Sequence, residues 1–236
     1  MKITKFHTGI ALTTSLLLAA LTGCGAANTA SSSGSASSST SVSTSSNSAK
    51  KHTSFFVKDN GDGTKVIKDI DGKEVTVPTN PERIADLWHA NNQVVLLLGG
   101  AEKLVSTTTA VKSLAWFKQV YPGIEKVDAP VKGTDVNMEQ LLADKPEVLL
   151  ASSKDQIAKA TEAGIPAVHV EFQNFADLKR TVELTAEVIG TDEAIERAEK
   201  YLAYLEKNEN LIKERLQGVT EAPKVLHIAG GSDLTE

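Results

Sequence analysis

The pair Trp88–His89 directly follows residues 83–87, a short apolar stretch that predicts a strand. An imidazole at a strand end can ligate a transition metal or hydrogen-bond a carboxylate of a bound molecule. His89 could equally serve only to order the entry into the next helix. A tryptophan beside it suits a large flat or amphipathic ligand, although it could instead pack beneath the loop. Both interpretations of each residue stay open.

Other side chains suited to binding follow further predicted strands. Thr108 follows the strand 103–107, the two serines follow the strand 146–151, and a second tryptophan lies in the long connection after Thr109. The carboxyl ends of parallel strands meet at one edge of a sheet, where ligands gather. Plain helix capping explains the serines equally well. The candidate ligand-binding residues are Trp88, His89, Asn91, Thr108, Trp116, Ser152 and Ser153.

The elements that must position these residues alternate between strand and helix. Strands are predicted at 83–87, 103–107, 146–151 and 166–170, and helices at 93–98, 137–143 and 154–163, with Asn91 or Asn92 capping the first helix. Alternation of this kind predicts an α/β fold, a Rossmann-like lobe with a parallel sheet covered by helices on both faces. A hairpin around Asp71–Gly72 precedes it. His169, inside an apolar strand, is expected to be a hydrogen-bonded core residue.

Two helices follow the last strand. An apolar stripe from Phe175 to Ile189 predicts one, and residues 192–217 predict a second of about 26 residues, nearly 40 Å long. This length exceeds what one small lobe needs. A further strand is expected at 224–229, where no sheet is available for it to join. We therefore expect a binding lobe at 55–190, a bridging helix at 191–218, and the start of a truncated second α/β lobe at 219–236.

Cys24 is the only cysteine in the chain and lies at the end of an apolar run, 10–21, that follows Lys2 and Lys5. The run is too short to span a bilayer comfortably and is typical of a signal peptide, here 1–23. Residues 28–48 are almost entirely small and polar, which predicts a flexible tether, 24–54 with Cys24. The sequence Leu-Thr-Gly-Cys resembles a bacterial lipobox. That resemblance implies a lipidated Cys24 and attachment to the extracytoplasmic face of the cell membrane.

Composition narrows the class of protein. The 236 residues include 25 Lys+Arg and 30 Asp+Glu, for a formal net charge of −5, and 41% are hydrophobic. These values are typical of a soluble globular protein, and no basic patch indicates nucleic-acid binding. The chain carries no nucleophile, zinc or phosphate-loop motif, so we expect no enzyme. A lipid-anchored surface enzyme with its catalytic residues in the rest of the protein and an adhesion module remain as alternatives.

Three segments occur in an order that indicates a family: "VPTNPERIADL", "VVLLLGGAEKLV" and "NMEQLLADKPEVLLAS". From about residue 69 to 229 the chain resembles the substrate-binding proteins of bacterial ATP-binding-cassette (ABC) importers for siderophores, haem, cobalamin and related metal chelates. The resemblance implies two lobes joined by one rigid helix, with the ligand in the cleft between them. It also implies an ABC permease and its ATPase as partners, and we expect a monomer with no covalent cofactor except the lipid.

The ligand that the resemblance implies is a metal complex, an iron-siderophore, haem or similar chelate. A small nickel or cobalt chelate is the alternative, with His89 as a candidate metal ligand. Two departures from the family pattern stand out. Gln93 occupies a position where the family commonly has a glutamate that docks on the permease, and the loop "LWHANN" replaces a serine-rich one.

Overall fold

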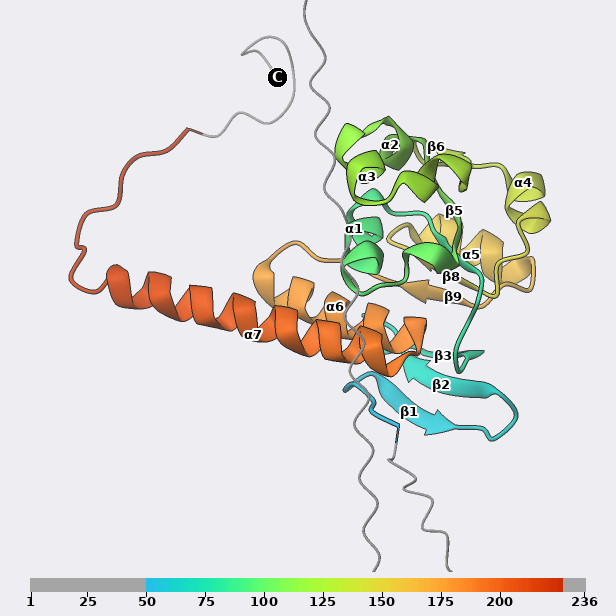
Figure 1. The fold of residues 1–236 in the computed structure, drawn as a ribbon, viewed down its shortest axis with the longest axis horizontal. Helices are drawn as coiled ribbons and strands as arrows, with labels where there is room; N and C mark the ends of the chain where they lie inside the picture. Colours follow the sequence, from blue (N-terminus) through green and yellow to red (C-terminus); the bar gives the residue numbers. More distant parts are fainter. Residues whose placement is uncertain (1–49, 227–236) are drawn as a thin grey trace, which may run out of the picture. The chain divides into compact units, whose positions relative to one another are not determined.

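A six-stranded sheet organises the lobe (Figure 1). The computed structural model describes residues 50–226, all within the second of two units into which the chain divides, Ser48–Glu236. The strand order is β7-β6-β5-β4-β8-β9, parallel except for β7. This arrangement confirms the predicted α/β fold with a parallel-rich sheet. The strands are β4 Ile84–Asp86, β5 Leu104–Thr108, β6 Asp128–Lys132, β7 Asp135–Val136, β8 Val148–Ala151 and β9 Ala167–His169.

Helices cover both faces of the sheet, because side chains along each buried strand alternate between two apolar clusters. Leu150 of β8 belongs to the cluster shared with the helices of one face, and its neighbour Leu149 to the cluster of the other. The first face carries α1 His89–Leu97, α2 Thr109–Ser113, α3 Ala115–Val120 and α6 Phe175–Ile189; the second carries α4 Met138–Ala143 and α5 Lys154–Glu162.

A separate three-stranded antiparallel sheet precedes the lobe. It consists of β1 Phe56–Asp59, β2 Thr64–Lys68 and β3 Glu74–Pro78, in that order. The predicted hairpin is confirmed as β2–β3, with Gly72 in the left-handed region at φ 85°. β1 was not predicted. The small sheet joins the main core through Ile67 and Val77, both fully buried.

Helix α1 begins earlier than expected. The sequence placed its start at Gln93 with an asparagine cap, but the helix starts at His89, and its N-cap, Trp88, makes no side-chain capping bond. Asn91 and Asn92 lie inside the first turn with 0% exposure, because their amides are turned inward to other partners. The connection 109–136 also contains four unexpected elements: α2, α3, β6 and β7. Short 3₁₀ turns occupy Ala101–Lys103 and Pro122–Lys126.

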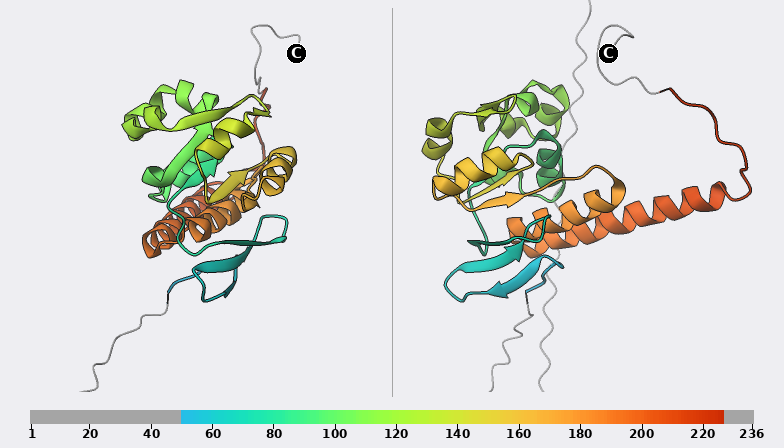
Figure 2. Two further views of the ribbon diagram at one scale, coloured as in Figure 1. Left: turned by 90° about the vertical axis from the view of Figure 1, so that its right-hand side faces the viewer. Right: turned by 180° about the vertical axis from the view of Figure 1, so that it is seen from behind.

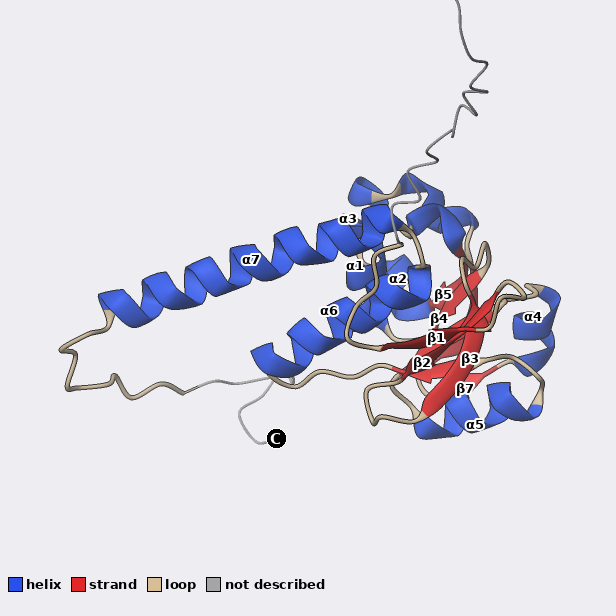
Figure 3. Ribbon diagram, turned by 90° about the horizontal axis from the view of Figure 1, so that it is seen from below, coloured by secondary structure: helices blue, strands red, loops and turns tan. Residues whose placement is uncertain are grey.

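The long helix α7, Asp192–Arg215, is present as predicted. Asp192 and Glu193 occupy its first turn and Lys213 and Arg215 its last, which matches the helix dipole. In its first two turns the side chains of Ala194, Ile195 and Ala198 are buried. The apolar residues Leu211, Ile212 and Leu216 near its end are exposed. Figures 2 and 3 show this second half of α7 running past the lobe.

Beyond α7 the predicted strand 224–229 is not found in its described part. Residues 224–226 have no regular structure, and Val225 and Leu226 are 80% and 83% exposed. The remaining residues of that predicted strand lie outside the described range, as do Cys24 and the predicted signal peptide. Within residues 50–226, no helix is both long enough and apolar enough to cross a membrane.

Candidate functional site

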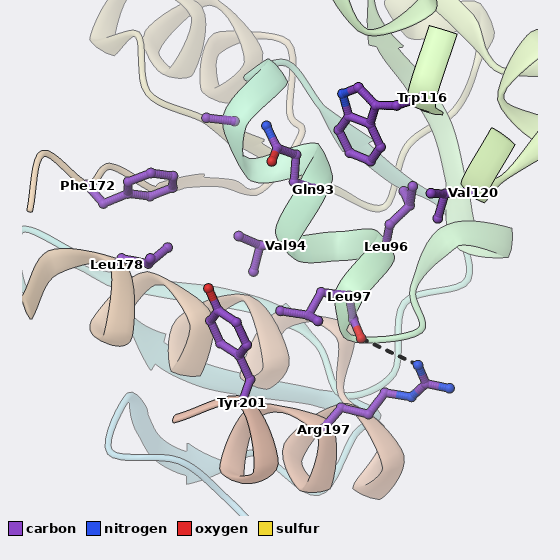
Figure 4. A pocket seen from close by; sticks show the side chains of 11 residues that line it. Gln93, Val94, Leu96, Leu97, Trp116, Val120, Phe172, Leu178, Arg197 and Tyr201 are labelled. Carbon is purple, nitrogen blue, oxygen red and sulfur yellow. Dashed lines mark hydrogen bonds between the residues drawn. The ribbon is translucent and has the colours of Figure 1, made fainter. Parts of the chain in front are cut away.

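A groove of about 590 Å³ lies beside α1, between α3, α6 and α7 (Figure 4). We refer to it as the α1 groove. Its walls are mostly apolar and aromatic, with Gln93 and Arg197 as the polar side chains apart from the Tyr201 hydroxyl. The lining residues are Ala90, Gln93, Val94, Leu96, Leu97, Trp116, Val120, Phe172, Leu178, Arg197 and Tyr201.

Three aromatic rings reach the α1 groove from three different elements. Trp116 comes from α3 and is stacked on Phe117 with ring centroids 3.9 Å apart, Phe172 comes from the loop after β9, and Tyr201 comes from α7. Rings held in this way offer large contact areas at little cost in conformational entropy. The groove is therefore suited to a bulky, partly apolar molecule rather than to a bare ion.

The charge of Arg197 is already engaged within the chain. Its Nη2 lies 2.8 Å from Glu193 Oε1, and its Nη1 donates to the carbonyl of Leu97 at 3.4 Å. The second contact ties α7 to the end of α1 at one end of the groove (Figure 4). Because Arg197 is already paired with Glu193, its role is to close one end of the groove rather than to present a free cation to an anionic ligand.

Of the seven residues predicted for the site, Trp116 lines the α1 groove. Trp88 is half-buried and does not line the groove, and its ring centroid lies 4.8 Å from that of Phe172 at an angle of 53°. It therefore supports an aromatic residue that does line the groove. His89 is exposed as the first residue of α1 and does not line the groove.

Two of the remaining predicted residues cap helices. Thr108 caps α2 by accepting a hydrogen bond from the Val111 N–H at 3.2 Å, and Ser153 caps α5 by accepting one from the Gln156 N–H at 3.4 Å. Capping was an alternative for Ser153 in the sequence analysis, whereas the cap formed by Thr108 was not predicted. Ser152 is half-buried beside Ser153. Asn91 does not reach the surface at all.

The buried carboxyl of Asp86, which lies at the start of the loop that carries Trp88 and His89, was not predicted from the sequence. Asp86, the last residue of β4, accepts hydrogen bonds from the Trp88 N–H at 3.1 Å and from Asn91 Nδ2 at 2.9 Å. Burial raises the pKa of Asp86 to about 8. An acidic residue that closes an apolar strand, followed at short range by two asparagines, is the signal that could have revealed it.

His169 is confirmed as a hydrogen-bonded core residue. It is 3% exposed, and its Nδ1 lies 3.0 Å from Asp71 Oδ2 in the β2–β3 turn. Among residues 50–226 its buried Nε2 has no hydrogen-bond partner, and Glu171 Oε2 lies 3.7 Å away. In the described part of the chain, no three His, Cys, Asp or Glu side chains are grouped so that they could hold a metal ion.

Known proteins resemble this chain in sequence and fold. An uncharacterized ABC transporter substrate-binding lipoprotein of Bacillus subtilis (strain 168), YvrC, is 26% identical over 193 residues, which cover 79% of this chain and 53% of the relative. A periplasmic solute binding protein from Veillonella parvula DSM 2008 is 26% identical with a TM-score of 0.59, covering 64% of this chain and 47% of its own.

The fold is also that of the molybdate periplasmic binding protein MolA of Haemophilus influenzae, with 23% identity, a TM-score of 0.60, and coverage of 66% of this chain and 55% of that one. The chain spans about half the length of these relatives. The family model described as "Periplasmic binding protein" matches residues 84–233, more than half of the chain. On this match the chain belongs to the periplasmic binding protein family.

Proposed function

We propose that this protein is a lipid-anchored, extracytoplasmic substrate-binding protein that delivers a metal chelate to the permease and ATPase of an ABC importer. Membership of the periplasmic binding protein family supports the binding role, and the name of the Bacillus subtilis relative supports the importer and the lipid anchor. The single observation that carries the proposal is the aromatic α1 groove, which opens beside the loop that ends β4.

A second lobe belongs to this proposal. The distal part of α7 exposes Leu211, Ile212 and Leu216 at 44%, 58% and 57%, an apolar stripe that the first lobe leaves uncovered. The relatives are about twice as long as the part that this chain matches, which leaves enough residues in them for a second lobe. We propose that it covers this stripe and closes over the ligand.

The class of ligand follows from the walls of the groove. Three aromatic rings and several aliphatic side chains suit a chelate with an organic surface, such as a ferric siderophore or haem. A small nickel or cobalt chelate is the alternative. It would need an open coordination position, and His89, which is exposed on the first turn of α1, is the residue proposed to fill that position.

A fluorescence titration tests the proposed site. The full-length protein would be titrated with haem, a ferric hydroxamate siderophore and a nickel–histidine mixture, with tryptophan quenching as the signal. Phe172→Ala, which removes a groove wall, should weaken the bound probe about tenfold or more. The matched control is Phe175→Ala, because Phe175 is 63% exposed and does not line the groove. Equal affinity of the two variants would contradict the proposed site.

A further inference from the structure

Five fully buried polar side chains form one network beneath the loop that follows β4. Asp86, Asn91, Asn92, Thr107 and Thr185 are each 0% exposed. They come from β4, α1, β5 and α6, so the network joins the sheet to both helices beside the α1 groove. Buried polar groups are costly unless they are hydrogen-bonded, and in this network the bonds connect the members to one another.

The hydrogen bonds have a consistent direction. Thr185 Oγ1 donates to Asn91 Oδ1 at 3.1 Å, and Asn91 Nδ2 donates to Asp86 Oδ2 at 2.9 Å. Thr107 Oγ1 donates to Asn92 Oδ1 at 2.7 Å, and Asn92 Nδ2 donates to the carbonyls of Asp86 at 2.9 Å and Trp88 at 3.0 Å. The side-chain amide of each asparagine therefore accepts a hydrogen bond through its oxygen and donates through its nitrogen.

The network acts on the stretch of backbone that carries Trp88 and His89. α1 has no side-chain cap, and the Trp88 N–H instead donates to Asp86 Oδ1 at 3.1 Å. The Trp88 main chain is thus held at its N–H by Asp86 and at its carbonyl by Asn92. Because the Trp88 ring packs against Phe172, displacement of this turn would also displace a wall of the α1 groove.

We infer that Asp86 is a positioning residue for ligand binding, which holds the first turn of α1 and, through Trp88, the aromatic wall of the α1 groove. This inference rests on the proposed function. Asp86 does not line the α1 groove, so we expect its effect on ligand affinity to be transmitted through Trp88 and Phe172.

The carboxyl has no charged partner that offsets its burial. Among the described residues, β5, α1 and α6 present only neutral groups to it, directly or through the network: Thr107, Asn91, Asn92 and Thr185. The charged or titratable side chains nearest in sequence are Arg83, whose guanidinium donates to the carbonyls of Asp144 and Lys145, and His89, which is exposed on the first turn of α1. Burial, opposed by the bonds from Trp88 and Asn91, raises the pKa of Asp86 to about 8. With a pKa of about 8, Asp86 is mostly neutral at pH 6 and mostly charged at pH 9.5. Because burial disfavours the charged form more than the bonds from Trp88 and Asn91 favour it, ionisation should loosen this buried turn.

A ligand-free measurement tests this positioning. Trp116→Phe leaves Trp88 as the only tryptophan of the chain, so acrylamide quenching between pH 6 and 9.5 reports the order of this loop. We expect quenching to increase with a midpoint near pH 8 and to stay flat after Asp86→Asn, while circular dichroism shows a folded protein throughout. Asp144→Asn is the matched control, because Asp144 is a buried acid that does not line the groove and its pKa is also raised by burial.

Thr185→Val provides a second variant in case Asp86→Asn does not fold. It removes the donor to Asn91 while leaving the carboxyl in place, and it should increase quenching of Trp88 at pH 6. Quenching of Trp88 that is the same in wild type, Asp86→Asn and Thr185→Val across this pH range would overturn the inference.

The consequence for binding is measured separately with haem and a ferric hydroxamate siderophore, using both tryptophans. Asp86→Ala should raise Kd about tenfold at pH 7, whereas Asp144→Asn should stay within about twofold of wild type. Wild-type affinity of Asp86→Ala for a probe that binds would overturn the inference and leave the proposed function intact. The expected Trp88 profile without binding of any probe would contradict the proposed function and leave the loop-positioning role of Asp86 standing.

Discussion

His89 is the residue on which the choice between ligands depends. It is exposed on the first turn of α1, and no hydrogen bond within residues 50–226 engages its ring. An imidazole presented in this way can fill an open coordination position on nickel or cobalt. A ferric siderophore already saturates its iron with its own oxygens and gains nothing from the imidazole.

We predict that His89→Ala weakens a nickel–histidine complex about tenfold or more, because a coordinating contact is lost. Affinity for a ferric hydroxamate siderophore should change by less than about threefold. Isothermal titration of wild type and variant against both complexes checks this. Unchanged nickel binding in the variant would show that the histidine only shapes the loop.

Among the elements, the small β1–β3 sheet is attached to α6 by a buried ion pair. Lys65 and Glu187 are 0% and 1% exposed, and Lys65 Nζ lies 3.0 Å from Glu187 Oε1. His52 Nδ1 also lies 3.0 Å from Oε1, and the Thr53 N–H donates to Oε2 at 2.8 Å. Burial acts to raise the pKa of Glu187, but Lys65, Thr53 and His52 together outweigh it and hold that pKa below its ordinary value. Residues 52 and 53, expected in the tether, thus contact α6.

We predict that Lys65→Met lowers the free energy of unfolding by about 3–5 kcal/mol, because it leaves the Glu187 charge buried without its main partner. The double variant Lys65→Met with Glu187→Leu should recover most of this loss, since no charge remains. Urea denaturation measures both. A double variant as unstable as the single one would show that packing, not charge, holds the sheet.

Helix α7 supports two different roles along its length. We predict that Ile195→Ala, in the buried first half, costs about 2–4 kcal/mol, whereas Ile212→Ala, 58% exposed in the second half, changes stability by less than about 0.5 kcal/mol. Denaturation of the 236-residue chain compares the two. Equal losses would mean that the second half of α7 is packed on the lobe, contrary to a bridging role.

The sequence predicted the long and strongly patterned helices well; among the short elements it predicted α4, β4 and β9 but missed α2, α3, β6 and β7. The stripe of α6, the Gly190 stop in the left-handed region, and the charged ends of α7 are local signals, so these helices were predicted within a few residues. The helices α2 and α3 span five and six residues, too short to show a helical period. The start of α1 was misplaced because tertiary burial turned both asparagines into the network around Asp86.

The candidate site was predictable only in part. Trp116 was found because tryptophans were few and one lay in a loop near the presumed cleft. Phe172 follows a predicted strand but was not among the candidate residues, and Tyr201 and Arg197 lie on α7 and reach the groove only through the tertiary packing of α7. Thr108 was predicted as a ligand contact and Ser153 was ambiguous between ligand contact and capping, and each caps a helix.

For the whole molecule, the predicted lipid anchor would hold the groove at the extracytoplasmic face of the membrane. Cys24 lies outside the described residues and its lipidation stays a prediction from the sequence. We expect Cys24→Ala to lose incorporation of a labelled palmitate and to be released from the membrane or remain unprocessed, because burial of the acyl chains is what retains the protein. Fractionation with labelling checks this, and equal membrane retention without loss of label would contradict the lipoprotein interpretation.

The central claim is that the full-length protein binds a metal chelate. Native mass spectrometry combined with elemental analysis, on protein purified from its own cells without added ligand, tests it most directly. We expect a non-covalent adduct of one small molecule per chain that contains stoichiometric iron, nickel or cobalt and is lost or reduced in Phe172→Ala but kept in Phe175→Ala. A metal-containing adduct that both variants retain equally would contradict the α1 groove as its site, and a bound molecule without metal would contradict metal-chelate binding itself.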